Sequence, residues 1–218
     1  MSEYRDPPGE APWAMPIVVR AEKGAEPTAA AVAEATATAV VQLLDDPRSV
    51  NGEWHDEVQR WLDGRIRKVA RRARGAKWDA AAELPGVTVS HAGAQVRAFV
   101  PGPTDAVPPQ IAKLQVAGLD LDPGTPSAAA PGILPIAVTP HVTMSPLKTA
   151  VQVAHAAQLA LALADVDRWR AAGFGVRLVR PDAEGWARLS ASARVVVRDA
   201  GFTEIPPDTQ TAIALWSD

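Results

Sequence analysis

The sequence of 218 residues contains no cysteine and no long apolar run. The absence of cysteine excludes disulfide bonds, thiolate nucleophiles and cysteine-based zinc sites. No stretch approaches the roughly 20 apolar residues that cross a membrane, and the polar residues 1–14 lack the apolar run of a signal peptide. We therefore expect a soluble cytoplasmic protein that does not bind a membrane.

An excess of positive charge is also absent, since the net charge is −3. A nucleic-acid partner would therefore have to bind a local basic patch. The sequence has no Gly-x-Ser-x-Gly elbow, no phosphate-binding loop and no His/Glu metal spacing. We expect neither a metal nor another cofactor.

The chain does contain an internal repeat. The informative matches are, at a shift of 119 residues, Pro16 with Pro135 and Pro27 with Pro146, and, at a shift of 108 residues, Trp61 with Trp169 and Trp78 with Trp186. Matches between alanine-rich helices follow from composition and carry no weight. Tryptophan, however, occurs only seven times, so two matched pairs in the same order favour a duplication. A period near 110 residues indicates whole domains rather than a solenoid.

The repeat divides the chain into a polar tail (1–14), a first copy (15–121), a linker rich in proline and glycine (122–133) and a second copy (134–218). We expect each copy to follow the order β, α, α, β, α, β, β, which is typical of an α/β fold with a crossover connection. The expected strands include 15–20, 67–72, 134–139 and 176–180, and the expected alanine-rich helices are 27–44 and 146–164.

One helix of the second copy carries polar residues on one face. Ser145 and Pro146 are typical of a helix start, and Lys148, Gln152 and His155 follow at a spacing of i, i+4 and i+7. A lysine in the first turn is unfavourable beside the positive end of the helix dipole, whereas a bound anion would explain it. Taken singly, each residue also has an explanation without a functional site. The lysine can be an exposed surface residue, the histidine a partly buried one, and the glutamine can have no role.

A second group of polar residues follows a strand. Three valines between two arginines, residues 194–198, predict a strand that is buried on both faces. Asp199 comes at its C-terminal end, where α/β sheets place ligand sites. Gly201 permits a sharp turn, and Thr203 adds a hydroxyl. The alternative is that Asp-Ala-Gly is an ordinary turn.

Together these segments resemble the archaeal-type (second-class) peptidyl-tRNA hydrolases. Lys148-Thr-Ala-Val-Gln-Val-Ala-His155 matches the family's Lys-x-Ala-Ala-Gln-x-Ala-His helix, and Arg198-Asp-Ala-Gly-Phe-Thr203 matches its Arg-Asp-Ala-Gly-x-Thr turn. The resemblance covers essentially all of the second copy. It implies a mixed four-stranded sheet flanked by helices, pairing of two like subunits, and metal-free hydrolysis of the ester that joins a peptide to tRNA.

The resemblance also implies roles for individual residues. The implied catalytic residues are Lys148, His155, Asp199 and Thr203, and the implied substrate-binding residues include Gln152 and Arg198. We expect Asp199, directly or through His155, to orient or activate water. Lys148 would stabilise the oxyanion or contact the terminal phosphate, while Thr203 and Gln152 would position the substrate.

The sequence departs from the family pattern in both copies. In the second copy, Leu147, His141, Glu204 and Asp208 stand where the family usually has Gly, Asp, Gln and Gly, which bears on tRNA docking. In the first copy, Ala29, Ala33, Thr36, His91 and Gln95 stand at the positions of Lys148, Gln152, His155, Asp199 and Thr203. We therefore expect the first copy to be a degenerate, inactive one. The two copies are expected to pair about a pseudo-two-fold axis within a monomer.

The first copy holds a run of cations without an intervening acid, namely Arg65, Arg67, Lys68, Arg71, Arg72, Arg74 and Lys77. From this run we assign Arg67, Lys68, Arg71 and Arg72 to tRNA phosphates. The alternative is a solvated charged face.

Three functions are open at this point. They are an active peptidyl-tRNA hydrolase, a non-catalytic tRNA- or RNA-binding protein on a hydrolase scaffold, and a structural protein built from a duplicated domain. The joint presence of Lys148, His155, Asp199 and Thr203 favours the hydrolase, because a binding protein has no need of all four.

Overall fold

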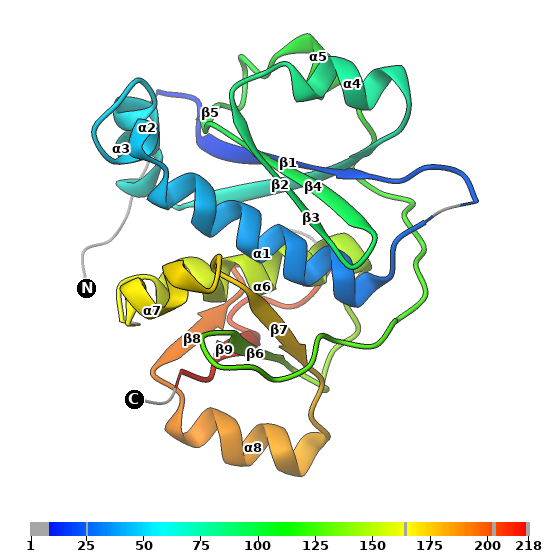
Figure 1. Ribbon diagram of the computed structural model, residues 1–218, viewed down its shortest axis with the longest axis vertical. Coiled ribbons are helices and arrows are strands. Elements are labelled where there is room, and N and C mark those ends of the chain that lie inside the picture. Colours follow the sequence, from blue (N-terminus) through cyan, green and yellow to red (C-terminus); the bar gives the residue numbers. More distant parts are fainter. Residues whose placement is uncertain (1–8, 25, 164, 202–203, 217–218) are drawn as a thin grey trace.

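The computed structural model describes residues 9–24, 26–163, 165–201 and 204–216. It is a mixed α/β structure with two β-sheets flanked by helices (Figure 1). Within these residues, no helix has both the length and the apolar character needed to span a membrane.

The two halves of the chain contain closely similar series of elements. The first half contains β1 (Trp13–Arg20), α1 (Ala29–Asp45), α2 (Pro47–Val50), α3 (His55–Leu62), β2 (Arg67–Ala73), α4 (Ala76–Ala82), β3 (Gly86–His91), β4 (Ala94–Phe99), β5 (Gly102–Pro103) and α5 (Pro109–Ala112). The second contains β6 (Leu134–Val138), α6 (Pro146–Ala160), α7 (Val166–Ala171), β7 (Val176–Val179), α8 (Ala183–Ser192), β8 (Val195–Arg198) and β9 (Gln210–Ala214). The described part of the second half follows the expected order β, α, α, β, α, β, β. The first half has α2, β5 and α5 in addition.

Four strands of each sheet share one topology, and in the first sheet β5 pairs with β1 in addition. The strand orders are β2-β1-β4-β3 and β7-β6-β9-β8. In each sheet the first two strands of the chain run parallel, and the other neighbouring strands run antiparallel. One expectation is wrong in detail: β8 lies at an edge of its sheet, so Val196 is only partly buried rather than enclosed on both faces.

Local irregularities also recur at the shift of 108 residues. Trp61 Nε1 donates to the carbonyl of Arg67 at 2.9 Å, and Trp169 Nε1 donates to the carbonyl six residues after it at the same distance. Ile66 and Phe174 both adopt a positive φ, 43° and 57°, which is uncommon for such bulky residues. Composition alone does not produce matched backbone outliers. These features therefore support a duplication independently of the sequence matches.

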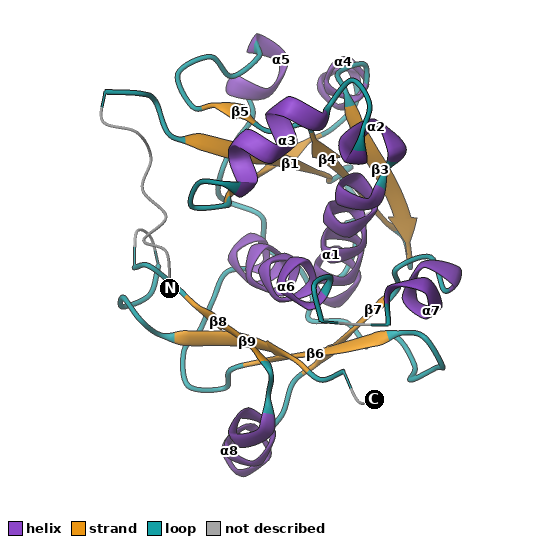
Figure 2. Ribbon diagram, turned by 90° about the vertical axis from the view of Figure 1, so that its left-hand side faces the viewer, coloured by secondary structure: helices purple, strands orange, loops and turns teal. Residues whose placement is uncertain are grey.

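The helices α1 and α6 lie side by side between the two sheets (Figure 2). The helices α4 and α5 lie beyond the first sheet, and α8 covers the outer face of the second. Thirteen of the 17 residues of α1 are buried, which is typical of a helix enclosed on all sides. Alanine on both central helices lets them approach closely, and their buried side chains belong to one apolar core that includes residues of both halves.

Contacts between the halves are reciprocal, as expected when two like domains pair. The helix α1 packs against β7, and α6 packs against β2. The linker contacts both halves. The carbonyls of Asp122 and Pro123 accept hydrogen bonds from the first backbone N–H groups of α1, and Arg177 Nε donates to the carbonyl of Ser127 at 3.0 Å. The candidate site lies where α6, β2 and the end of β8 meet.

Candidate functional site

The start of α6 places the first residue of the site. Ser145 caps the helix, its Oγ accepting from the backbone N–H of Lys148 at 3.2 Å, and Pro146 occupies the first turn. Leu147 is buried in the core. Lys148 therefore lies in the first helical turn, where the backbone N–H groups of a helix start add to its positive charge.

Asp199 brings together two of the expected helix residues. Its Oδ2 accepts from Lys148 Nζ at 2.6 Å and from Gln152 Nε2 at 2.7 Å. Thr211 Oγ1 donates to Gln152 Oε1 at 2.6 Å, which fixes the orientation of that amide. The side chains of Lys148 and Asp199 are only 12% and 9% exposed. This arrangement is a largely buried, hydrogen-bonded ion pair, which is the kind of site where charge strongly affects a bound ligand.

The turn after β8 holds the carboxylate of Asp199 in place. Gly201 donates its backbone N–H to Oδ1 at 2.8 Å. Gly201 has a φ of 76°, and a Cβ there would lie 2.6 Å from the backbone nitrogen of Pro207, so a larger residue would disturb the turn. The backbone of Asp199 is also bonded to that of Thr209 and Asp208. Thr203, which we expected to be catalytic, falls outside the described residues.

His155 does not contact Asp199. Its Nδ1 lies 2.9 Å from Lys68 Nζ, which reaches across from β2 in the other half of the chain. Among the described residues, the expected route from Asp199 through His155 to a water molecule is therefore absent. Burial lowers the pKa of His155 well below its usual value, and the charges of Lys68 and Lys148 lower it further.

The cation run of the first half does not form one surface, contrary to our expectation. Side chains alternate between the two faces of a strand, and β2 directs Lys68 inward, where it is only 9% exposed. Arg71 instead lines an apolar cavity of about 430 Å³ and donates to the carbonyl of Leu114 at 3.0 Å. Arg72 is partly buried. Of the four residues assigned to phosphates, Arg67 and Lys68 line the cleft that contains Asp199.

This cleft has a volume of about 790 Å³ and is lined by both halves of the chain. Five of its lining residues are Lys or Arg and one is acidic; they are Arg65, Arg67, Lys68, Lys148, Arg198 and Asp199. Arg65 and Arg198 are exposed, so they are accessible to a ligand. An excess of cations in a concave site favours an anionic ligand.

The departures from the family pattern have structural counterparts. The carboxylate of Glu204 accepts from the backbone N–H and the hydroxyl of Ser145 at 2.8 and 2.6 Å, so it binds the residue that caps α6. Asp208 adopts a φ of 62°, a conformation that favours glycine, and its Oδ2 lies 3.2 Å from Arg198 Nη1. His141 is exposed and does not line the cleft.

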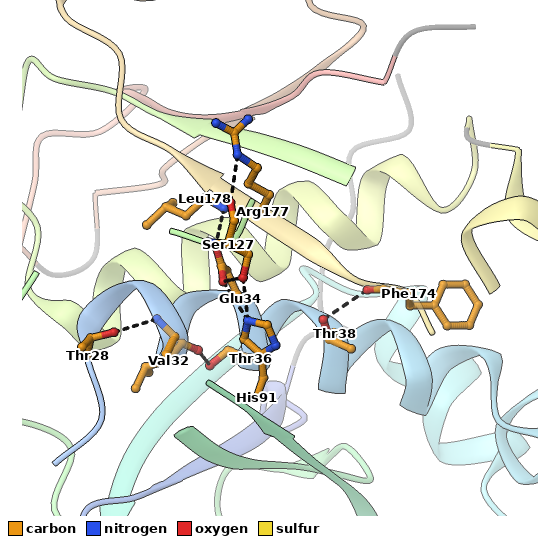
Figure 3. A network of polar contacts seen from close by, with 11 residues as sticks. Thr28, Val32, Glu34, Thr36, Thr38, His91, Ser127, Phe174, Arg177 and Leu178 are labelled. Carbon is orange, nitrogen blue, oxygen red and sulfur yellow. Dashed lines mark hydrogen bonds and ion pairs between the residues drawn. The ribbon is translucent and has the colours of Figure 1, made fainter. Parts of the chain in front are cut away.

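In the first half, His91, at the position that matches Asp199, belongs to a different cluster, which Figure 3 shows. His91, at the position of Asp199, lies with its Nε2 2.8 Å from Glu34 Oε2. Glu34 is 1% exposed and also accepts from the backbone N–H and the hydroxyl of Ser127 in the linker, and from the backbone N–H of Leu178 on β7. The linker thus occupies the place that corresponds to the cleft of the second half.

Sequence reasoning missed the cluster around Glu34, although one signal was available. Glu34 is the only charged residue between Ala29 and Leu44, in a stretch rich in alanine. A buried carboxylate requires partners, because its desolvation is costly. The position of Ser127 in a linker gave no corresponding signal.

No three His, Asp or Glu side chains gather as a metal site within the part of the chain that the structure describes. Comparison of the chain with models of protein families, with curated proteins and with solved structures found no match in any of the three.

Proposed function

We propose that this chain hydrolyses the ester bond that joins a peptide, or an N-blocked amino acid, to tRNA, and so releases free tRNA and the acyl group. The observation that carries the proposal is the convergence of Lys148, Gln152 and Asp199 in a cationic cleft. The resemblance of the same residues to the hydrolase motifs supports this choice of substrate.

Ester hydrolysis requires a positioned water molecule, stabilisation of the oxyanion and protonation of the leaving ribose oxygen. Asp199 is suited to the first task. Its Oδ2 accepts two hydrogen bonds, whereas its Oδ1 accepts one, from Gly201, among the described residues. A carboxylate oxygen has two acceptor positions, so Oδ1 can also accept a hydrogen bond from a water molecule and orient it toward the ester carbonyl.

Lys148 is suited to the second task. Its ammonium is fixed beside the start of a helix of 15 residues, where the helix dipole adds positive potential. A preorganised cation in a site that excludes water stabilises negative charge more strongly than the same cation in bulk solvent. The oxyanion of the tetrahedral intermediate and the terminal phosphate of tRNA are both anions that this ammonium can bind.

The arginines of the cleft are suited to hold the tRNA. Arg65 and Arg67 come from the first half and Arg198 from the second, so a bound tRNA end would contact both halves. Contacts between cations and phosphates give binding without sequence preference and make it dependent on salt.

The same cations also support the alternative, an RNA-binding protein without catalysis. Burial of the Lys148–Asp199 pair argues for the enzyme, because two desolvated charges are costly and phosphate binding does not require the carboxylate. The test is incubation of the purified chain with N-acetyl-aminoacyl-tRNA. The proposal predicts release of tRNA over many turnovers. Tight tRNA binding without release would favour the alternative.

A further inference from the structure

Lys68 belongs to the first half of the chain, yet its side-chain nitrogen ends among side chains of the second half. Its Nζ lies 2.9 Å from His155 Nδ1 and also contacts Gln158 Oε1. The ring of Trp61 lies below it, with the centroid 4.9 Å from Nζ. Each of these neighbours can accept a hydrogen bond or attract a cation. The surroundings of Lys68 therefore favour donation of its N–H groups.

The direction of this hydrogen bond depends on which nitrogen of His155 carries the proton. A neutral imidazole has one donor and one acceptor nitrogen. Burial and two nearby cations lower the pKa of His155, so the ring is neutral near pH 7. If Nδ1 accepts from Lys68, the ring proton lies on Nε2, and His155 is a hydrogen-bond donor through that nitrogen.

We propose that Lys68 is a positioning residue, which the first half supplies in order to hold His155 as the Nε2–H tautomer. This role rests on the proposed hydrolysis. His155 would then donate a hydrogen bond from Nε2 to an oxygen of the substrate, rather than activate water. The cleft, which His155 lines, is where such an oxygen would bind. The degenerate half is then required for more than binding tRNA.

The packing of α1 against β7, which corresponds to that of α6 against β2, shows that a lysine–histidine pair is not required for this packing. The position of Lys68 corresponds to Val176 and that of His155 to Thr36. Thr36 donates to the carbonyl of Val32 at 2.6 Å within its own helix. The packing of α1 on β7 therefore forms with threonine and valine at these two positions. A buried lysine, whose desolvation is unfavourable, stands at only one of the two places.

The test is NMR of the chain labelled with 15N in its histidine side chains, of which there are four. His155→Gln identifies the resonances of His155. Wild-type protein at pH 7.5 should show His155 as the Nε2–H tautomer. Lys68→Met should remove this preference, and Lys68→Arg, which keeps the donor, should retain it. An Nδ1–H tautomer in the wild type, or an unchanged spectrum in Lys68→Met, would overturn the inference.

Turnover separates this inference from the proposed function. Lys68→Met should reduce kcat about 10²-fold, with little change in tRNA affinity, and Lys68→Arg should restore part of the rate. If the wild type shows the Nε2–H tautomer but hydrolyses no ester, the proposed function is rejected. The inference that Lys68 controls the tautomer of His155 would still hold. The wild-type spectrum is informative by itself, so the inference stays testable even if Lys68→Met does not fold.

Discussion

Lys148 Nζ and Asp199 Oδ2 lie 2.6 Å apart, although the two residues are separated by 51 positions in the chain. The helix start that holds Lys148 and the turn that holds Asp199 therefore form one charged unit. Because both side chains are largely buried, neither charge is well solvated without the other. This dependence has a consequence for stability.

Lys148→Met should lower the free energy of unfolding by about 3 kcal/mol, because it leaves the carboxylate of Asp199 buried without its cation. The double variant Lys148→Met with Asp199→Asn should recover part of this loss, since no charge is then left unpaired. Urea unfolding of the wild type, of Lys148→Met, of Asp199→Asn and of the double variant gives the coupling energy. Strictly additive effects would show that the pair is not coupled.

The pH dependence of stability should report on Lys68. Burial lowers its pKa well below the ordinary value of 10.5, so the unfolded chain keeps this proton to higher pH than the folded chain does. Stability should therefore rise with pH between the folded-state pKa and 10.5, by up to about 1.4 kcal/mol per pH unit. His155 is neutral in both states above about pH 8 and does not contribute there.

Unfolding curves of wild type and Lys68→Met between pH 8 and 10 isolate this effect, since all other groups are shared. The wild-type free energy of unfolding should rise more steeply with pH than that of the variant. Parallel curves would mean that Lys68 titrates alike in the folded and unfolded chains.

Replacing Arg65 and Arg67 by Gln should weaken tRNA binding and reduce its salt dependence. Counterion release predicts a change in slope of up to about 0.9 for each duplex phosphate that the variant no longer neutralises. The matched control is the replacement of Arg74 and Lys77, which are exposed cations of the same run that do not line the cleft. Equal effects of the two double variants would indicate that binding is not localised to the cleft.

The full chain should be a monomer in solution, and residues 134–218 alone should self-associate or be poorly soluble. The reason is that α6 packs against α1 and β2 of the first half, so its apolar face would be exposed in the fragment. Light scattering measures both masses. A dimer of the full chain, or a monodisperse and soluble fragment, would contradict the expectation that the halves pair within one chain.

Much of the backbone could be predicted from the sequence, because hydrophobic patterning and helix-start residues act locally. Ser145 and Pro146 predicted the start of α6 at the residue where it begins. The predicted strands at 67–72 and 176–180 correspond to β2 and β7 within one residue at each end. The matched tryptophans predicted that the two halves would share one order of elements.

The position of Lys68 could not be predicted in this way. Its place in a run of cations suggested an exposed phosphate-binding residue, but the alternation of side chains in β2 directs it into the contact between the halves. That contact depends on tertiary packing of α6 against β2, which periodicity does not specify. For the same reason, the sequence did not reveal that the linker covers the first half at Glu34 and His91.

The most direct test of the proposed function compares Asp199→Asn with His91→Asn, which alters the corresponding position of the first half. The measurement is single-turnover hydrolysis of N-acetyl-aminoacyl-tRNA at saturating protein, with tRNA affinity and circular dichroism recorded for each variant. We predict that Asp199→Asn lowers the rate by a factor of about 10² or more and that His91→Asn keeps the wild-type rate. A wild-type rate for Asp199→Asn, or an equal loss in both variants, would contradict a single hydrolytic site in the second half.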